Sequence, residues 1–397
     1  MCRPGCKWSA AYRRISCSSV FFATLALLPK LPGAAVRGSW APSRMTACRF
    51  PLGSGLASKP SHFPRLAKWR DDPPRLGLAR ARSAAWPQFS PTSPPLPWTE
   101  PPCIDVSLTV HTRDGRRLEV IVTGPGEGRA FVFHSGTPSA AVPYKPLIDA
   151  VLERGLQFVT YSRPGYAGST EHHGRSVADA ASDVATILNE LDVPSFVTLG
   201  RSGGGPHALA CAAMLPDRCE RAATLAGVAP YPAAGLDWFA GMGTDNIEEF
   251  TLALEGEAFL VPWLEQQAQT LASVQPAGVS AALGDLVSSV DEAALTGTLA
   301  EYAAESFRRS VSTGIAGWRD DDLAFARPWG FMLETISVPV SVWQGDQDRM
   351  VPLAHGAWLA AHIPGAEPHL IKGEGHLSLG ERGLDAVLDD LCGVSRS

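Results

Sequence analysis

The chain has 397 residues, 45% of them hydrophobic, and a formal net charge of −6 at pH 7. This length and apolar content exclude a small module without a core of its own and favour two or three structural units. No segment, the short apolar run at 20–28 included, reaches the ~18 consecutive apolar residues that a membrane-spanning helix needs, so we expect no stable membrane span.

The first hundred residues differ from the rest in charge and composition. They carry 15 of the 34 lysines and arginines but only three of the 40 acidic residues, a net charge of +12 that leaves −18 for the remainder. They also hold 14 of the 33 prolines and show no sustained helical or strand periodicity. We therefore expect residues 1–102 to be a basic, proline-rich extension that is disordered or not native.

Three interpretations of this extension have different consequences. A start assigned upstream of the true one, with Met45 as a later start, is the interpretation that we favour. Arg13 and Arg14, the apolar run 20–28 and the small residues near 33–35 have instead the layout of a secretory signal. A functional basic arm is the third interpretation, because blocks of like charge often bind nucleic acid or membrane surfaces. We expect no nucleic-acid partner.

The eight cysteines are scattered and form no C-x-x-C pair. Cys2 and Cys6 have a spacing that zinc sites use, but no matching second pair or nearby histidine follows them. We therefore expect free thiols in a cytoplasmic protein, or a secreted protein if residues 1–35 are a signal peptide.

From about Cys103 the chain alternates between strand-like and helix-like segments. Two alternating runs on either side of Asp114 and Gly115 predict a β-hairpin over 107–124, since this pair favours a tight turn. The later strands are short and almost continuously apolar, and a helix such as 176–191 has its apolar residues on one face. The expected strands are 129–136, 157–165, 195–200, 222–230, 336–345 and 368–376, and the expected helices are 143–154, 176–191, 204–215 and 380–392.

This alternation predicts an α/β protein with a mostly parallel, doubly wound sheet and an antiparallel edge at the hairpin. Its expected core is formed by residues 103–228 and 336–397. The segment 229–335 has helical periods, with acidic helix starts near Asp245 and Asp291 and a proline interruption at residue 262. We expect this segment to form a helical cap inserted between two strands.

A candidate nucleophile follows one of these strands, at the end of a parallel sheet where ligands collect. Ser202 lies in "GRSGG" (200–204), a G-x-S-x-G motif between a strand and a helix. The turn of such an elbow is so sharp that the residues two before and two after the serine approach each other. Gly200 and Gly204 meet this steric demand.

Asp348 and His376 follow two later strands, and with Ser202 they give the order nucleophile, acid, histidine. Together with "YSRPGYAGS" (161–169), this order resembles the α/β-hydrolase fold family with a helical cap. The loop 161–169 has a serine where that family usually has an aspartate. The resemblance implies a catalytic triad of Ser202, Asp348 and His376, with Asp346 as the alternative acid.

The same resemblance implies an oxyanion hole made by two backbone N–H groups. One belongs to Gly203, directly after the serine. The other belongs to Thr137 in "HSGTP" (134–138), where an inserted serine leaves Gly136 as the alternative donor. A serine hydroxyl needs a neutral imidazole to accept its proton, and the imidazole needs a carboxylate to orient it. We therefore expect an acyl-enzyme at Ser202 that water hydrolyses.

We predict a serine hydrolase that acts, without a cofactor or metal, on a small-molecule substrate: a small or medium, mostly apolar ester, thioester or amide. The alternative is a receptor-like binding module, or a relative that performs aminopeptidase, peroxidase or C–C hydrolase chemistry with the same triad. For an aminopeptidase, the acidic run 320–322 is the only hint of a site for a free amine.

Several other residues are expected to be structural or have no assigned role. His134 and His207 are interpreted as packing residues, and His172 and His173 as part of a solvated loop without a metal cluster. Arg201, next to the nucleophile, is unexplained. The candidates for an apolar pocket lining, or alternatively for the core of the cap, are Trp238, Phe239, Trp263, Phe331 and Met332.

Overall fold

The structure is a computed structural model that describes residues 106–126 and 128–394. The basic extension expected over 1–102, with Met45 and the signal-like run, lies outside the described residues. Among the residues that the structure describes, none of the helices has the length and apolar character that crossing a bilayer demands.

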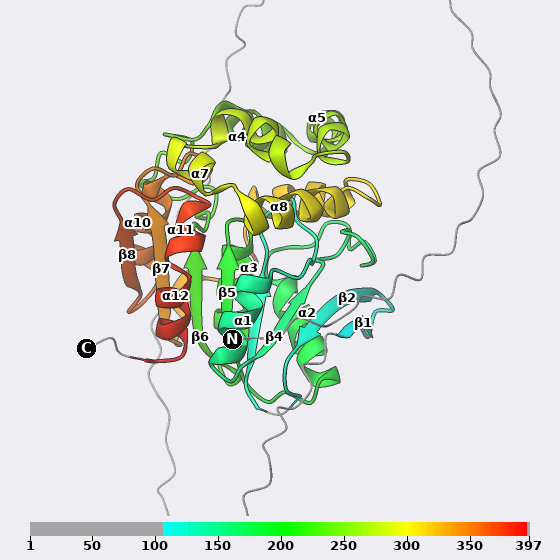
Figure 1. Ribbon diagram of the computed structural model, residues 1–397, viewed down its shortest axis with the longest axis vertical. Coiled ribbons are helices and arrows are strands. Elements are labelled where there is room, and N and C mark those ends of the chain that lie inside the picture. Colours follow the sequence, from blue (N-terminus) through cyan, green and yellow to red (C-terminus); the bar gives the residue numbers. More distant parts are fainter. Residues whose placement is uncertain (1–105, 127, 395–397) are drawn as a thin grey trace, which may run out of the picture. The chain divides into compact units, whose positions relative to one another are not determined.

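One eight-stranded sheet forms the centre of the described chain, in the order β1-β2-β4-β3-β5-β6-β7-β8 (Figure 1). The β1–β2 hairpin and the β2–β4 pair are antiparallel, and all other neighbouring strands are parallel. The predicted mostly parallel sheet with an antiparallel edge is therefore confirmed. The strands are β1 (Val106–His111), β2 (Arg117–Thr123), β3 (Ala130–His134), β4 (Gln157–Tyr161), β5 (Phe196–Arg201), β6 (Cys219–Leu225), β7 (Val340–Gly345) and β8 (Glu367–Ile371).

Helices cover both faces of this sheet, so the sheet is doubly wound. Val132 of β3 belongs to the apolar cluster formed with α2, α3 and α10, whereas its neighbour Phe131 belongs to the cluster formed with α1 and α12. Successive side chains of a strand point to opposite faces, which explains why a strand buried on both sides is apolar throughout. These helices are α1 (Lys145–Glu153), α2 (Asp179–Glu190), α3 (Gly204–Met214), α10 (Leu353–His362), α11 (Ser378–Arg382) and α12 (Leu384–Leu391).

Most predicted elements overlap the observed ones, and the differences have local causes. The strand expected over 222–230 ends already at Leu225, because Ala226 takes a φ of 55°, which extended backbone does not allow. The prediction of one final helix over 380–392 was wrong. Two short helices, α11 and α12, meet at Gly383, where a Cβ would lie 2.7 Å from the carbonyl oxygen of Leu379.

The segment between β6 and β7 is mostly helical, and we call residues 229–335 the helical insert. In Figure 1, α4, α5, α7 and α8 lie over the end of the sheet toward which β5 and β6 point. The helices of the insert are α4 (Thr244–Glu255), α5 (Glu257–Leu271), α6 (Val279–Leu283), α7 (Ser289–Ala294), α8 (Gly297–Ser310) and α9 (Ala316–Phe325).

The expected interruption at Pro262 was wrong, because α5 continues through this residue. The break between α4 and α5 falls instead at Gly256, which has a φ of 118°. Leu260 and Leu264, on either side of the proline, are fully buried in the core of the insert. Their packing outweighs the backbone hydrogen bond that a proline inside a helix removes.

Candidate active site

Ser202 lies on a strained turn between β5 and α3. Its φ of 54° is in the left-handed region, which is unfavourable for a residue other than glycine and which is frequent at functional sites. The Ser202 N–H donates to the carbonyl of Leu225 at 2.9 Å, and the N–H of Gly205 donates to the Ser202 carbonyl at 2.8 Å. These bonds hold the strained turn in place at the carboxyl end of β5.

Three glycines allow this turn to pack against its neighbours. A Cβ on Gly200 would lie 2.2 Å from the carbonyl oxygen of Gly204, which is the close approach inferred from the motif. A Cβ on Gly204 would lie 2.1 Å from the carbonyl oxygen of His134. A Cβ on Gly203 would lie 2.5 Å from the Thr137 Oγ1, so the turn and the loop after β3 are in direct contact.

Asp348 and His376, in the loops after β7 and β8, are buried and hydrogen bonded to each other. The Nδ1 of His376 lies 2.8 Å from the Oδ2 of Asp348. The same oxygen accepts a bond of 2.8 Å from the Gln344 amide, and Oδ1 accepts the backbone N–H groups of Met350 and Val351 at 2.9 and 2.8 Å. Four donors thus fix the carboxylate of Asp348 in the orientation that holds the imidazole.

The alternative acid, Asp346, has different partners. Its carboxylate is exposed and accepts the backbone N–H of Gly373 at 2.7 Å and the Gln347 amide at 3.1 Å. This backbone bond, the main cause, lowers the pKa of Asp346 below its ordinary value. The geometry therefore favours Asp348 as the partner of His376.

Ser202 and His376 line one cavity of about 160 Å³ beneath the helical insert. The loop after β3 contributes Gly136 and Thr137, and Arg201 also borders it. The remaining wall comes mainly from apolar residues of the insert, among them Trp263, Leu271, Leu283, Leu295, Leu299, Phe307 and Trp318.

Of the five residues considered for an apolar pocket lining, only Trp263 borders this cavity. Trp238 and Phe239 pack in a separate cluster, and Phe331 packs against the core of the sheet. Met332 is 63% exposed. The sequence could not separate these roles, because aromatic residues of a helical segment serve equally well in either place.

The loop after β3 is held by Arg163, which follows β4. Its guanidinium donates to the carbonyl of Ser135 at 2.6 Å and to that of Gly136 at 2.7 Å. In a trans peptide the N–H points opposite to the carbonyl, so these bonds aim the N–H groups of Gly136 and Thr137 away from Arg163. A Cβ on Gly136 would lie 3.2 Å from the Cβ of Ser202, which places this loop beside the serine. Thr137 and Gly136 both stay candidates for the oxyanion donor.

Asp321, on α9 of the insert, completes the support of this loop. It accepts a bond of 2.8 Å from the Thr137 hydroxyl and pairs with Arg163 and Arg175 at 2.6 and 2.7 Å. Burial alone would raise the pKa of Asp321, but the charges of the two arginines hold that pKa well below its ordinary value. None of the aspartates at 320–322 lines the cavity, so this acidic run serves the loop and its neighbours rather than an amine site.

His134 and His207 are buried and structural, as expected. Burial, together with the charge of Arg163, lowers the pKa of His134 to about 3, so the ring is neutral. Burial also lowers the pKa of His207 well below its ordinary value. The Nδ1 of His207 donates to the Gly203 carbonyl at 2.9 Å, because a carbonyl oxygen only accepts, and this bond fixes the first turn of α3.

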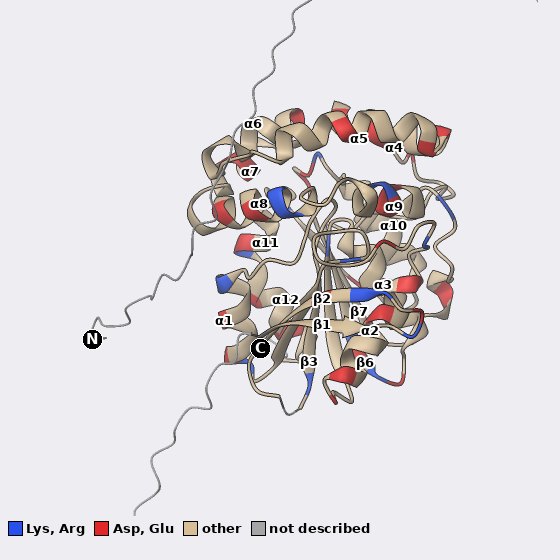
Figure 2. Cartoon of the chain, turned by 90° about the vertical axis from the view of Figure 1, so that its right-hand side faces the viewer, with Lys and Arg blue, Asp and Glu red and all other residues tan. Residues whose placement is uncertain are grey.

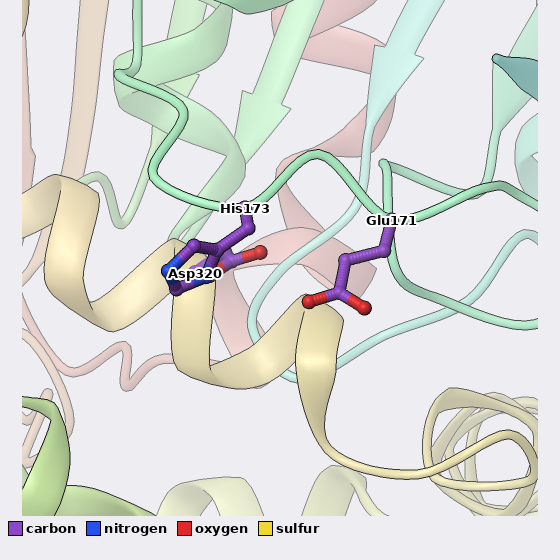
Figure 3. Close-up of side chains that lie close together, drawn as sticks. All are labelled: Glu171, His173 and Asp320. Atoms are coloured by element: carbon purple, nitrogen blue, oxygen red, sulfur yellow. The ribbon is translucent and has the colours of Figure 1, made fainter.

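The structure also groups three residues that the sequence left apart. Glu171, His173 and Asp320 lie close together (Figure 3), and their ligand atoms are within 4.8 Å of one another. The Arg319 guanidinium, however, pairs with Glu171 and also with Asp320, at 2.9 Å. Because this cation already pairs with both carboxylates, and because Glu171 and His173 are exposed, we assign an ion-pair network here and no metal site.

Asp291 is a residue of interest that the sequence analysis took only as a helix-start acid. It lies on α7 and is fully buried, and its carboxylate accepts the backbone N–H groups of His376, Leu377 and Ser378 at 3.0, 2.7 and 2.9 Å. A Cβ on Gly375 would lie 2.3 Å from this carboxylate, so the histidine loop passes directly over it. No local sequence signal connects residues so far apart in the chain.

Glu249 and Asp322 form a buried carboxyl pair between α4 and α9. The Trp318 indole N–H donates to Glu249 at 2.6 Å, and Glu249 also borders the cavity. Burial raises the pKa of Glu249 to about 7 from an ordinary value of 4.5. Burial and then the charge of Glu249 raise the pKa of Asp322 well above its ordinary value. The pair therefore retains a proton under near-neutral conditions.

This pair predicts a pH dependence of stability. Between about pH 4.5 and 7 the native state binds a proton that the unfolded state has released, so the free energy of unfolding falls as the pH rises. Glu249→Gln is expected to be more stable than the wild type at pH 8, by about 1–3 kcal/mol, because an amide keeps the bonds without a charge. Urea unfolding at pH 5, 6.5 and 8 measures the free energy of unfolding of the wild type and of Glu249→Gln. The substitution Glu248→Gln, at the exposed neighbouring residue, serves as control. A Glu249→Gln protein that is less stable than the wild type at pH 8 contradicts the prediction.

A mostly parallel sheet, a serine on the strained turn after β5 and a histidine–carboxylate pair after β8 and β7 define an α/β protein of the hydrolase type. The sequence model of one protein family, described as the alpha/beta hydrolase fold, matches residues 129–382 of this chain. The chain belongs to this family, as the resemblance of its motifs implied.

Individual relatives are distant in sequence. An uncharacterized hydrolase of Bacillus subtilis, YcgS, is 27% identical over 272 residues, which is 67% of this chain and 90% of that protein. A non-heme chloroperoxidase of Streptomyces lividans is 30% identical over 148 residues, 37% of this chain and 54% of that protein. Among solved structures, epoxide hydrolase A of Mycobacterium thermoresistibile is 19% identical with a TM-score of 0.55, over 72% of this chain and 98% of that one. This structural likeness concerns the fold alone.

Proposed function

We propose that the protein is a serine hydrolase that cleaves a small or medium, mostly apolar ester, thioester or amide through an acyl-enzyme on Ser202. The observation that carries this proposal is that Ser202, on its strained turn, and His376, bonded to Asp348 at 2.8 Å, border the same cavity. The apolar wall of that cavity supports an apolar acyl or leaving group. Its volume of about 160 Å³ is close to that of the ~150 Å³ cavities that bind benzene, which supports a small substrate.

In the proposed reaction, His376 is the general base. The bond from Nδ1–H to Asp348 keeps the proton on that nitrogen and leaves Nε2 free to accept the proton of the Ser202 hydroxyl. The serine oxygen attacks the carbonyl carbon, and the negative charge moves to the carbonyl oxygen. The backbone N–H groups of Gly203 and of Thr137, or alternatively Gly136, would bind that oxyanion.

Collapse of the tetrahedral intermediate breaks the bond to the leaving group, which departs with the proton from His376. Water then loses a proton to the same imidazole and attacks the acyl-enzyme. Release of the acid returns Ser202 and His376 to their starting states. Every step uses side chains, backbone N–H groups and water.

Labelling with a fluorophosphonate probe tests the proposal. We expect one label per chain, located by mass spectrometry on the peptide that contains Ser202, and turnover of p-nitrophenyl esters with short acyl chains. A folded protein that takes no label overturns the proposed nucleophile. Label without turnover identifies the cavity as a receptor site and overturns the hydrolase.

Asp291 provides a further prediction about this activity. Asp291→Ala is expected to lower kcat for ester hydrolysis about tenfold, because the histidine loop loses its acceptor and His376 is held less firmly. The loss of these bonds also costs about 1–2 kcal/mol of stability. Asp291→Asn keeps one acceptor oxygen and should therefore recover part of the lost kcat and part of the lost stability. The substitution Glu292→Ala, at the exposed neighbouring residue, serves as control. Steady-state kinetics and urea unfolding measure the two effects. Wild-type kcat in Asp291→Ala contradicts the positioning role.

A further inference from the structure

Arg201 combines two properties that no other described arginine shares. It directly precedes Ser202 and is the one lysine or arginine among the described residues that border the cavity. Its side chain is only partly exposed. Among the described arginines that are buried or half-buried, Arg201 is the one whose side chain makes neither a hydrogen bond nor an ion pair.

A partly buried cation without a counter-ion is unfavourable, because the loss of hydration is not compensated. The fully buried arginines of the protein follow this rule, since Arg163 and Arg175 both pair with Asp321. Glu381 borders a second pocket together with Arg201, but its two carboxylate oxygens lie 2.6 and 2.7 Å from the Tyr144 hydroxyl, which donates to them, and no ion pair among the described residues joins Glu381 to Arg201. The charge of Arg201 is therefore left for a ligand of the cavity.

We propose that Arg201 binds a carboxylate of the substrate, so that the protein prefers esters that carry a carboxylate close to the scissile carbonyl, such as half-esters of short dicarboxylic acids. This inference rests on the proposed hydrolase function. A guanidinium is planar and can bind both oxygens of a carboxylate at once. The Cζ of Arg201 lies 3.9 Å from the position of a Cβ on Gly380, four residues after His376, so the guanidinium is on the side of the histidine loop.

The other charges of the cavity limit where this carboxylate lies. Asp245 and Glu249 border the cavity from α4, and α4 and α5 carry acidic but no basic residues (Figure 2). A carboxylate at the end of a long acyl chain, near α4, would be repelled. The arrangement therefore favours a short distance between the substrate carboxylate and the ester, on the side of Arg201.

The test compares half-esters with neutral esters of equal chain length. Monoethyl succinate, glutarate and adipate are measured against ethyl butanoate, pentanoate and hexanoate, by titration of the acid released. In the wild type, kcat/KM for the best half-ester is expected to exceed that of its neutral counterpart by about 10- to 100-fold, as one charged bidentate contact provides. Arg201→Met should abolish this preference, and Arg201→Lys should keep part of it. Arg327→Met, at an exposed arginine away from the cavity, should leave the preference unchanged.

A binding measurement on the wild type covers the case in which Arg201→Met fails to fold. Pentanoate should protect Ser202 from the fluorophosphonate at about tenfold lower concentration than pentanamide, which has the same shape without the charge. Equal protection by the two, or an equal ratio of half-ester to neutral ester in wild type and Arg201→Met, overturns the inference while the hydrolase stands. If neither ester class is turned over and Ser202 takes no label, the proposed function itself fails.

Discussion

Replacement of Ser202 by alanine is expected to lower kcat for ester hydrolysis by about 10³- to 10⁶-fold and to abolish fluorophosphonate labelling. The variant removes the oxygen that forms the acyl-enzyme, so only the weak acceleration by binding and by the oxyanion donors is left. Stability should change little, because the backbone bonds of the turn, from the Ser202 N–H to Leu225 and from Gly205 to the Ser202 carbonyl, are independent of the hydroxyl.

The matched control is Ser139→Ala, at a second serine that borders the same cavity. It should retain both the label and most of the activity. Thermal unfolding of all three proteins establishes that the Ser202 variant is folded. Labelling that persists in folded Ser202→Ala would move the nucleophile to another serine and would overturn the proposed mechanism.

Some features of the candidate site could be predicted because they depend on short stretches of chain. Ser202, Asp348 and His376 each lie in the turn or loop after a strand, and the carboxyl ends of parallel strands meet at one edge of a sheet. Gly200 and Gly204 could be assigned because the steric demand arises within five residues. The hairpin at Asp114 and Gly115 and the order of strands and helices are local in the same sense. The hairpin and this order of elements describe most of the observed fold.

Other features depend on contacts between distant residues and left no local signal. Asp291 and Asp321 have the sequence context of ordinary helix acids, yet both are fully buried and bind loops of the sheet. Their partners, the loops at His376 and at Thr137, become visible only when the helical insert is folded over the sheet.

These two aspartates give the helical insert a role beyond covering the cavity. Asp291 of α7 binds the backbone of the histidine loop, and Asp321 of α9 binds the Thr137 hydroxyl of the loop beside Ser202. Both loops belong to the sheet, while both carboxylates belong to the insert. Movement of the insert would therefore disturb the proposed base and the proposed oxyanion hole together, and this coupling makes the insert part of the site's preorganisation.

The strongest test of this coupling is Asp321→Ala, which is expected to destabilise the protein by about 3–5 kcal/mol. The loss leaves Arg163 and Arg175 as buried charges without a counter-ion, and breaking a buried ion pair on one side has this cost. Asp321→Asn has nearly the same shape but no charge, so it should retain the Thr137 bond and still lose much of the stability. For comparison, Asp385, whose side chain is 75% exposed, pairs with Arg154 at the surface, and Asp385→Ala should cost less than about 1 kcal/mol.

Urea unfolding at pH 7 measures these differences, and kcat measured well below the unfolding transition separates stability from positioning. Because Arg163 also holds the carbonyls of Ser135 and Gly136, we expect folded Asp321→Asn to lose at least tenfold in kcat as the loop relaxes. An Asp321→Asn protein with wild-type kcat would mean that Arg163 alone orients the loop. The charge of Asp321 would then stabilise the fold without contributing to the geometry around Ser202.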